Sequence, residues 1–329
     1  MSMLDIATKL SFWGPVTLFA LGIPGALING ILFIGIKTFR QSPSSYYVVG
    51  QSLFDIGALL ILFLQIFPSL PLMSSKISCK LMVFFTEVTV PCAMSFLCLA
   101  AFDRWACTSR SARIRQLSSK NIARCLFPMP FLFWSCVNAP YLIFVDYVPQ
   151  LFSCWFTNDL FQQIATYFLT PFMVALFPLI ILVIFGILTH RNIRLIKHMH
   201  IQQNQARNRL SQWEQQMTRM MIAQTCISII CILPQLIGLL YSVATLNTRA
   251  MRSYDQVVLE YLINQITTFI IGINFASSFY IFFLSSPRFR KSIKTYLKQL
   301  IQVRDNRIGI VDASFTAQNA VTQHQDKHY

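Results

Sequence analysis

The chain has 329 residues, of which 55% are apolar and 12% are charged, and its formal net charge is +15. A soluble domain carries about 25% charged residues, so this composition excludes a soluble protein and indicates an integral membrane protein. The basic excess does not indicate nucleic-acid binding, because the lysines and arginines fall in short connections and not on a soluble basic face with aromatic platforms.

The charged residues leave seven apolar windows of at least 20 residues each. Five windows contain no Asp, Glu, Lys or Arg, and two contain a single acid, Asp55 in the second and Glu87 in the third. A transmembrane helix needs about 20 apolar residues, whereas a β-barrel would show shorter alternating segments. We therefore expect an all-α membrane protein, a seven-transmembrane helix bundle. The windows are residues 10–36, 41–75, 81–102, 125–145, 160–190, 220–248 and 261–287.

The chain is expected to divide into four parts. Residues 1–10 form an extracellular N-terminus, and residues 11–285 form the seven-span domain. Residues 286–301 form a short amphipathic eighth helix, because apolar residues recur there at helical spacing among Lys and Arg. Residues 302–329 form a polar, disordered cytoplasmic tail. The first window is too long for the apolar region of a signal peptide, which spans about 7 to 15 residues.

The distribution of lysine and arginine predicts the orientation. Eight of these residues follow spans one and three, six lie between spans five and six, and eight follow span seven. Only five lie on the opposite side. Cytoplasmic loops are the more basic ones, so the chain is expected to be a multi-pass protein of the plasma membrane, with its N-terminus extracellular and its C-terminus cytoplasmic. The lipid bilayer is thus one partner, and its anionic inner leaflet accounts for the basic charge.

The third span carries different chemistry at its two ends. Cys79 and Arg104 are 25 residues apart. At a rise of about 1.5 Å per residue, this is roughly 37 Å, slightly more than the 30 Å or so of a hydrocarbon core. Arg104 at a membrane boundary needs a partner, which the adjacent Asp103 can supply. Such a helix suits a protein that passes a signal across the membrane.

The cysteines predict one disulfide bond. Of nine cysteines, only Cys79 and Cys154 lie on the expected outer side, where thiols can be oxidised. A bond between them would hold the loop between spans four and five over the mouth of the bundle. Two unrelated free thiols are the alternative.

Two acids lie within spans, where burial of a charge costs at least about 2.5 kcal/mol. Glu87 lies about 12 Å below the outer surface by helical rise, which is a suitable depth for a ligand. It could meet a cationic group on a peptide or pair with a neighbouring span, and both alternatives remain open. Asp55 is expected to bond to Asn29 or Asn274. Trp155 beside Cys154 could line the entry to a ligand pocket or belong to an interfacial aromatic belt.

Together, seven spans, the two outer cysteines and the Asp103-Arg104-Trp105 triplet resemble the rhodopsin-like (class A) family of G-protein-coupled receptors. Single positions in the spans also match the family pattern: Asn29, Asp55, Trp134, Pro178, Pro234 and Tyr280. The chain departs from the pattern at Trp105, where tyrosine is usual, and at Ile232, where the family has a switch tryptophan. Span seven has Ala276-Ser277 in place of the usual Asn-Pro pair. These departures make it a divergent member, and the resemblance is to an invertebrate neuropeptide type of receptor.

The resemblance implies a cell-surface receptor that binds an extracellular ligand and activates a heterotrimeric G protein by outward movement of span six. Asp103, Arg104 and Glu214 would form an ionic lock at the G-protein site, although a solvated Glu214 is the simpler alternative. The family's activation relay maps onto Asn29, Asp55, Pro234, Asn274 and Tyr280. Thr86 stands where amine receptors carry an aspartate, so a peptide ligand is favoured over an amine, with Thr86, Glu87 and Trp155 as pocket candidates.

The family's sodium site makes Asp55 a weak metal candidate, because Ala93 and Ala276 replace the hydroxyl and amide that usually complete that site. We expect no other metal and no cofactor. No catalytic motif occurs, so an enzyme is not expected. The alternative function is a small multi-span transporter, which the odd number of spans and the lack of inverted halves disfavour.

Overall fold

A computed structural model describes residues 2–66, 75–148, 153–202, 212–245, 252–296 and 298. Within these ranges, seven helical segments are long and apolar enough to cross a membrane, which confirms the predicted bundle. They are Met3–Gly35, Ser44–Leu64, Lys76–Thr108, Lys120–Phe144, Asp159–Leu195, Glu214–Ala244 and Tyr254–Ser285.

Five spans are single helices: α1 (Met3–Gly35), α3 (Ser44–Leu64), α4 (Lys76–Thr108), α11 (Gln212–Ala244) and α12 (Tyr254–Ser285). The fourth span is composite, with α6 (Lys120–Leu126), α7 (Met129–Asn138) and α8 (Tyr141–Phe144). Pro128 and Pro140 stand immediately before α7 and α8, and their rings interrupt the run of backbone hydrogen bonds.

The fifth span is also composite and consists of α9 (Asp159–Ile164), η2 (Ala165–Leu176) and α10 (Phe177–Gln202). The middle segment η2 is a π-helix that contains Pro171. Such wide turns occur frequently at functional sites. The remaining elements are α2 (Lys37–Arg40), α5 (Ala112–Leu117), β1 (Val145–Val148) and β2 (Ser153–Phe156).

The first helix begins within the segment predicted as an extracellular N-terminus. Ser2 caps α1 and accepts a hydrogen bond from the N–H of Asp5 at 3.2 Å, and Asp5 pairs with Lys9 one turn later at 3.3 Å. A capping serine, an acid in the first turn and an i,i+4 ion pair all favour a helix start. The charge at Lys9 therefore does not end the helix.

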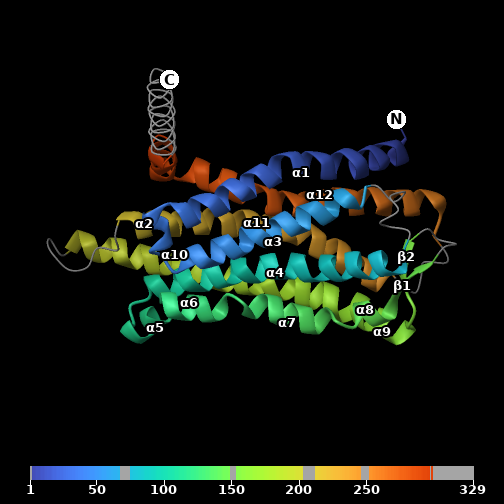
Figure 1. Cartoon of the computed structure of the whole chain (residues 1–329), viewed down its shortest axis with the longest axis horizontal. Helices are drawn as coiled ribbons and strands as arrows, with labels where there is room; N and C mark the ends of the chain where they lie inside the picture. The colour runs from blue at the N-terminus through green and yellow to red at the C-terminus, as the bar shows by residue number, and fades with distance from the viewer. Residues whose placement is uncertain are drawn as a thin grey trace, which may run out of the picture. The chain divides into compact units, whose positions relative to one another are not determined.

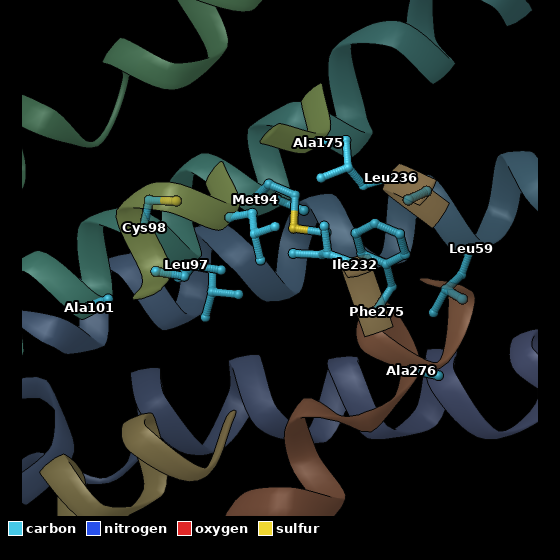
Figure 2. Close-up of a cluster of buried hydrophobic side chains, with 14 of the residues drawn as sticks. Leu59, Met94, Leu97, Cys98, Ala101, Ala175, Ile232, Leu236, Phe275 and Ala276 are labelled. Atoms are coloured by element: carbon cyan, nitrogen blue, oxygen red, sulfur yellow. The ribbon is translucent and has the colours of Figure 1, made fainter. Parts of the chain in front are cut away.

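The spans enclose an apolar core, the largest part of which lies between α4, α11 and α12. Helix α4 packs against α3, α7, α10 and α11, while α1 packs against α3 and α12. Figure 2 shows Met94 of α4, Ile232 of α11 and Phe275 of α12 meeting in this core. Gly22 allows the close approach of α1 to α12, because a Cβ there would lie 3.1 Å from the Ala276 Cα.

The two ends of the bundle differ. The hairpin of β1 and β2 lies at one end, and α5 and α6 lie at the other (Figure 1). We name these the disulfide end, after Cys79 and Cys154, and the arginine end, after Arg104. Helix α4 connects the two.

The described residues from Ser286 onward belong to a separate unit. Residues 287–296 are helical, and Ser286 accepts a hydrogen bond from the N–H of Phe289 at 3.0 Å, which caps the start. A helix therefore follows the seventh span, as the amphipathic pattern predicts. The predicted tail of residues 302–329 lies outside the described residues.

Candidate functional site

The predicted disulfide bond between Cys79 and Cys154 is present. Cys154 lies on β2, which pairs antiparallel with β1, so that Tyr147 stands opposite Cys154. The bond ties this hairpin to the first turn of α4. This confirms the predicted disulfide bond and rules out the alternative of two free thiols.

An aromatic cluster and a surface ion pair also hold the hairpin. Phe156 of β2 packs against Tyr141 and Phe161, with ring centroids 6.0 Å and 5.9 Å away. Asp146 of β1 lies 3.6 Å from the ammonium group of Lys76 at the start of α4. The pKa of Asp146 is lowered, chiefly because its carboxylate accepts the N–H of Tyr147 at 2.8 Å, with a smaller contribution from Lys76. The hairpin is therefore fixed to α4 by covalent, apolar and charged contacts.

A cavity of ≈ 270 Å³ lies among α3, α4, η2, α11 and α12. Most of its wall is apolar, and Glu87 is the single charged residue among those that line it. Thr86 also lines the cavity, so the structure brings these two predicted pocket residues together. In the part of the chain that the structure describes, no ion pair involves Glu87. Glu87 therefore places a carboxyl group in an otherwise largely apolar cavity wall.

Trp155, the third predicted pocket residue, is not among the residues that line the cavity. Side chains alternate along a strand, and Cys154 next to it is bonded to α4. Trp155 accordingly points the other way and is 48% exposed.

The floor of the cavity is part of the apolar core. Ile232, at the position where the family has a tryptophan, is buried there beside Met94 and Phe275 (Figure 2). Pro234 lies inside α11, two residues further along. Gln235 also lines the wall, and sequence reasoning missed it, although a glutamine within an apolar span is a signal that could have found it. Span six thus reaches the cavity directly.

The expected partners of Asp55 were wrong. Asp55 is fully buried and accepts a hydrogen bond from Ser278 of α12 at 3.1 Å. Asn29 instead donates to Ser52 at 3.2 Å, and Asn274 accepts from Ser228 at 2.5 Å. These two amides have other partners, and the side chains that hydrogen-bond to Asp55 are Ser278 of α12 and Gln51 of its own helix α3.

A complete sodium shell does not form around Asp55. Its Oδ1 atom is buried and has no hydrogen-bond partner among the described residues. Ala93 and Ala276 supply no oxygen from their side chains, so Ser278 is the hydroxyl at hand. Elsewhere in the described residues, no group of three or more His, Cys, Asp or Glu side chains could hold a metal ion.

The last residue of the predicted relay, Tyr280, lies nearer the lipid-facing surface. It is 38% exposed, and its hydroxyl donates to the carbonyl of Leu21 in α1 at 2.8 Å. It therefore fastens α12 to α1 and not to the buried Asp55.

At the arginine end, Asp103 and Arg104 form a buried ion pair, each 2% exposed. The guanidinium donates to Asp103 Oδ2 from Nη2 at 2.6 Å and from Nε at 3.2 Å. Glu214, in the first turn of α11, acts electrostatically on Arg104. The three residues predicted for the ionic lock therefore gather at this end.

Serines from three places hold this ion pair, and sequence reasoning missed them. Ser44 at the start of α3 donates to Asp103, as does Ser118 from the connection between α5 and α6 at 2.7 Å. Ser42 accepts from Arg104 Nη2 at 3.4 Å. The run Ser42-Pro43-Ser44-Ser45 was the available signal, because hydroxyl groups cluster there at a membrane boundary.

The comparison with known families agrees with this geometry. A family model described as 7 transmembrane receptor (rhodopsin family) matches residues 30–290, a range that includes the cavity, the disulfide bond and the Asp103–Arg104 pair. No individual curated protein matches the chain significantly. The family does not favour the transporter alternative. The chain belongs to the rhodopsin family of seven-transmembrane, G-protein-coupled receptors and is a multi-pass protein of the plasma membrane.

Proposed function

We propose that this receptor binds an extracellular peptide at the disulfide end and activates a heterotrimeric G protein at the arginine end. The observation that carries the proposal is Glu87, a carboxyl group without an ion-pair partner in the described residues, in the wall of a cavity of ≈ 270 Å³. The charge distribution supports the orientation, because most of the lysines and arginines follow spans one, three, five and seven.

Two features favour a peptide over a simple amine. Thr86 occupies the position at which the family's amine receptors carry an aspartate, and the neighbouring Glu87 points about 100° away from it on a helix. A second cavity of ≈ 60 Å³ shares Gln235 and Leu239 with the main one and is lined by Glu260. A ligand that fills both is longer than a simple amine. Its cationic group would pair with Glu87.

The signal would pass along α11. Ile232 is in the cavity wall and Glu214 is near Arg104, and both belong to this helix. The receptor would exist in two states, with α11 in an inward or an outward position. A ligand that binds the outward state more tightly shifts the equilibrium towards it, by as much as its affinities for the two states differ. Outward movement would separate Glu214 from Arg104 and open a cleft for the G protein.

The test is a peptide library applied to cells that express the receptor and report several G-protein pathways. We expect a basic peptide to activate one pathway, Arg104→Ala to abolish the response, and Glu87→Gln to weaken the peptide at least about tenfold, because a buried charge pair is lost. Phe85→Leu, at an exposed neighbour that does not line the cavity, is the matched control and keeps the response. An active peptide that acts equally on Glu87→Gln would overturn the role of Glu87. Ligand-driven uptake of a solute, without any pathway response, would favour a transporter.

A further inference from the structure

Ser118 links an exposed connection to the buried ion pair. Its hydroxyl donates to Asp103 Oδ1 at 2.7 Å, while Asp103 itself is 2% exposed. Ser118 is half-buried and ends α5, directly before Ser119 caps α6. A covalent modification of this hydroxyl therefore changes a direct hydrogen bond to the carboxylate that pairs with Arg104.

The segment that carries Ser118 is loosely attached. None of the six residues of α5 is buried, so little apolar contact area holds this helix. Local opening costs little free energy where few apolar contacts are made. The connection can therefore leave the bundle and present Ser118 in an extended form, which a modifying enzyme requires.

The residues around Ser118 carry positive charge. Arg113 and Arg115 lie five and three positions before it and are exposed, and Lys120 follows two positions after it. Arg115 makes only long hydrogen bonds, of 3.3 Å, to the carbonyl groups of Ser109 and Arg110. Two upstream guanidinium groups suit an enzyme with an acidic substrate groove, because arginine pairs strongly with carboxylates.

We propose that Ser118 is phosphorylated by a protein kinase that selects basic sequences, and that the modified connection cannot return to Asp103. In the reaction, Ser118 Oγ bonds to the γ-phosphorus of ATP, the bond from that phosphorus to the β,γ-bridging oxygen breaks, ADP leaves, and the hydroxyl proton passes to a base of the kinase. The proposal rests on the proposed orientation, which puts the arginine end in the cytoplasm with the kinase and ATP.

The phosphate would act on Asp103 in two ways. Phosphoserine has no hydroxyl to donate, so the hydrogen bond of 2.7 Å is lost. It also adds a charge of about −1.5 to −2, which repels the adjacent carboxylate. Asp103 then keeps Ser44 and Arg104 as partners and loses its contact with the connection. The modification thereby loosens one of the restraints on Arg104.

The first experiment treats the purified receptor in lipid nanodiscs with such a kinase and ATP, and locates the phosphate by mass spectrometry. We expect phosphate on Ser118, and a rate at least about tenfold lower in the double variant Arg113→Gln, Arg115→Gln, since both ion pairs with the kinase are lost. Ser119→Ala is the control and keeps the phosphate on Ser118. Absence of phosphate on Ser118, or an equal rate in the double variant, overturns the proposal.

The second experiment measures hydrogen–deuterium exchange in peptides that cover residues 109–126. Phosphorylation is expected to speed exchange roughly tenfold, because a hydrogen bond to a charged group is replaced by repulsion. Ser118→Ala loses only the hydrogen bond and should show a smaller increase. Ser44→Ala removes a different donor to Asp103 and should leave this exchange unchanged. Exchange that stays the same after phosphorylation overturns the proposed release.

A third measurement separates this proposal from the proposed function. Both faces of a nanodisc are accessible to the kinase, so the first two results depend neither on orientation nor on a ligand. In cells, phosphate on Ser118 supports both the site and the orientation. The opposite result is a receptor that is phosphorylated in nanodiscs and never in cells, with an epitope tag that places the arginine end outside the cell. That result overturns the proposed orientation, and with it the phosphorylation of Ser118 in cells.

Discussion

Ser278 of α12 donates a hydrogen bond of 3.1 Å to Asp55 of α3, and both side chains are buried. The bond joins spans two and seven in the middle of the bundle. The other oxygen of Asp55 has no hydrogen-bond partner in the described part of the chain. Ser278 therefore makes the direct polar link between this buried acid and span seven.

Ser278→Ala should destabilise the receptor by roughly 1 to 3 kcal/mol, because a buried carboxyl group loses one of its two side-chain donors and keeps only Gln51. Ser277→Ala is the matched control, since that hydroxyl bonds only at 3.5 Å to the Asn274 carbonyl of its own helix. Thermal unfolding of the purified receptor in detergent compares the two variants. Equal melting temperatures would show that the Asp55–Ser278 bond contributes nothing to stability.

Ser44→Ala should raise signalling in the absence of ligand. The variant removes a charge-assisted hydrogen bond to Asp103, so the carboxylate holds Arg104 less firmly. A loss of roughly 1.4 kcal/mol would change the ratio of the two receptor states about tenfold. Basal G-protein activation in cells, normalised to surface expression, checks this.

Ser45→Ala is the comparison for that experiment. Ser45 is also buried at the start of α3, but its hydroxyl donates to the Phe39 carbonyl and not to Asp103. It should lower expression without raising basal activity per receptor. A rise of the same size in both variants would contradict the role given to Ser44.

The sequence alone was sufficient for the span count and for both ends of α4. Windows with at most one charged residue define the spans, and the distance between Cys79 and Arg104 depends only on the rise of one helix. Cys154 was found because few cysteines lie on that side. Each of these inferences needs no knowledge of how the helices are rotated.

The partner of Asp55 could not be predicted in this way. Asn274 and Ser278 are four residues apart, so they lie on the same face of α12, one turn from each other. An axial shift of α12 by about one turn, roughly 6 Å, decides which of them reaches Asp55. The hydrogen bond from Ser118 to Asp103 likewise depends on the path of the connection between α5 and α6. The spacing of apolar residues in the sequence does not predict that path.

Gly22→Ala should destabilise the bundle. The added Cβ would lie 2.5 Å from the Leu59 side chain and 3.1 Å from the Ala276 Cα, so backbone and side chain must both shift. Overpacking of this kind costs about 1 to 3 kcal/mol. Gly30→Ala in the same helix is the control, because its Cβ would meet only the Ser52 Cβ at 4.0 Å. Alanine favours helices, so Gly30→Ala should melt at the same temperature or higher, and a similar loss in both variants would contradict the close approach of α1 and α12.

Asp146→Asn should loosen the β1–β2 hairpin at neutral pH and have no effect in acid. The pKa of Asp146 in the folded protein is lowered from its ordinary 3.8, first by the N–H of Tyr147 and then by the charge of Lys76. A group with a lowered pKa stabilises the fold at pH values above the ordinary one, and this contribution is lost as the pH falls through the folded value.

Hydrogen–deuterium exchange of residues 145–148 and 153–156 measures the effect at pH 7 and at stepwise lower pH. Wild type and Asp146→Asn should differ at pH 7 and converge below the ordinary pKa of 3.8. Salt should reduce the difference only in part, because it screens Lys76 and leaves the hydrogen bond from Tyr147 in place. Lys76→Gln removes one of the two positive charges that salt screens, the other being Lys80, and should match wild type in high salt. A difference between wild type and Asp146→Asn that persists unchanged in acid would mean that the asparagine perturbs the hairpin by its shape and not by its charge.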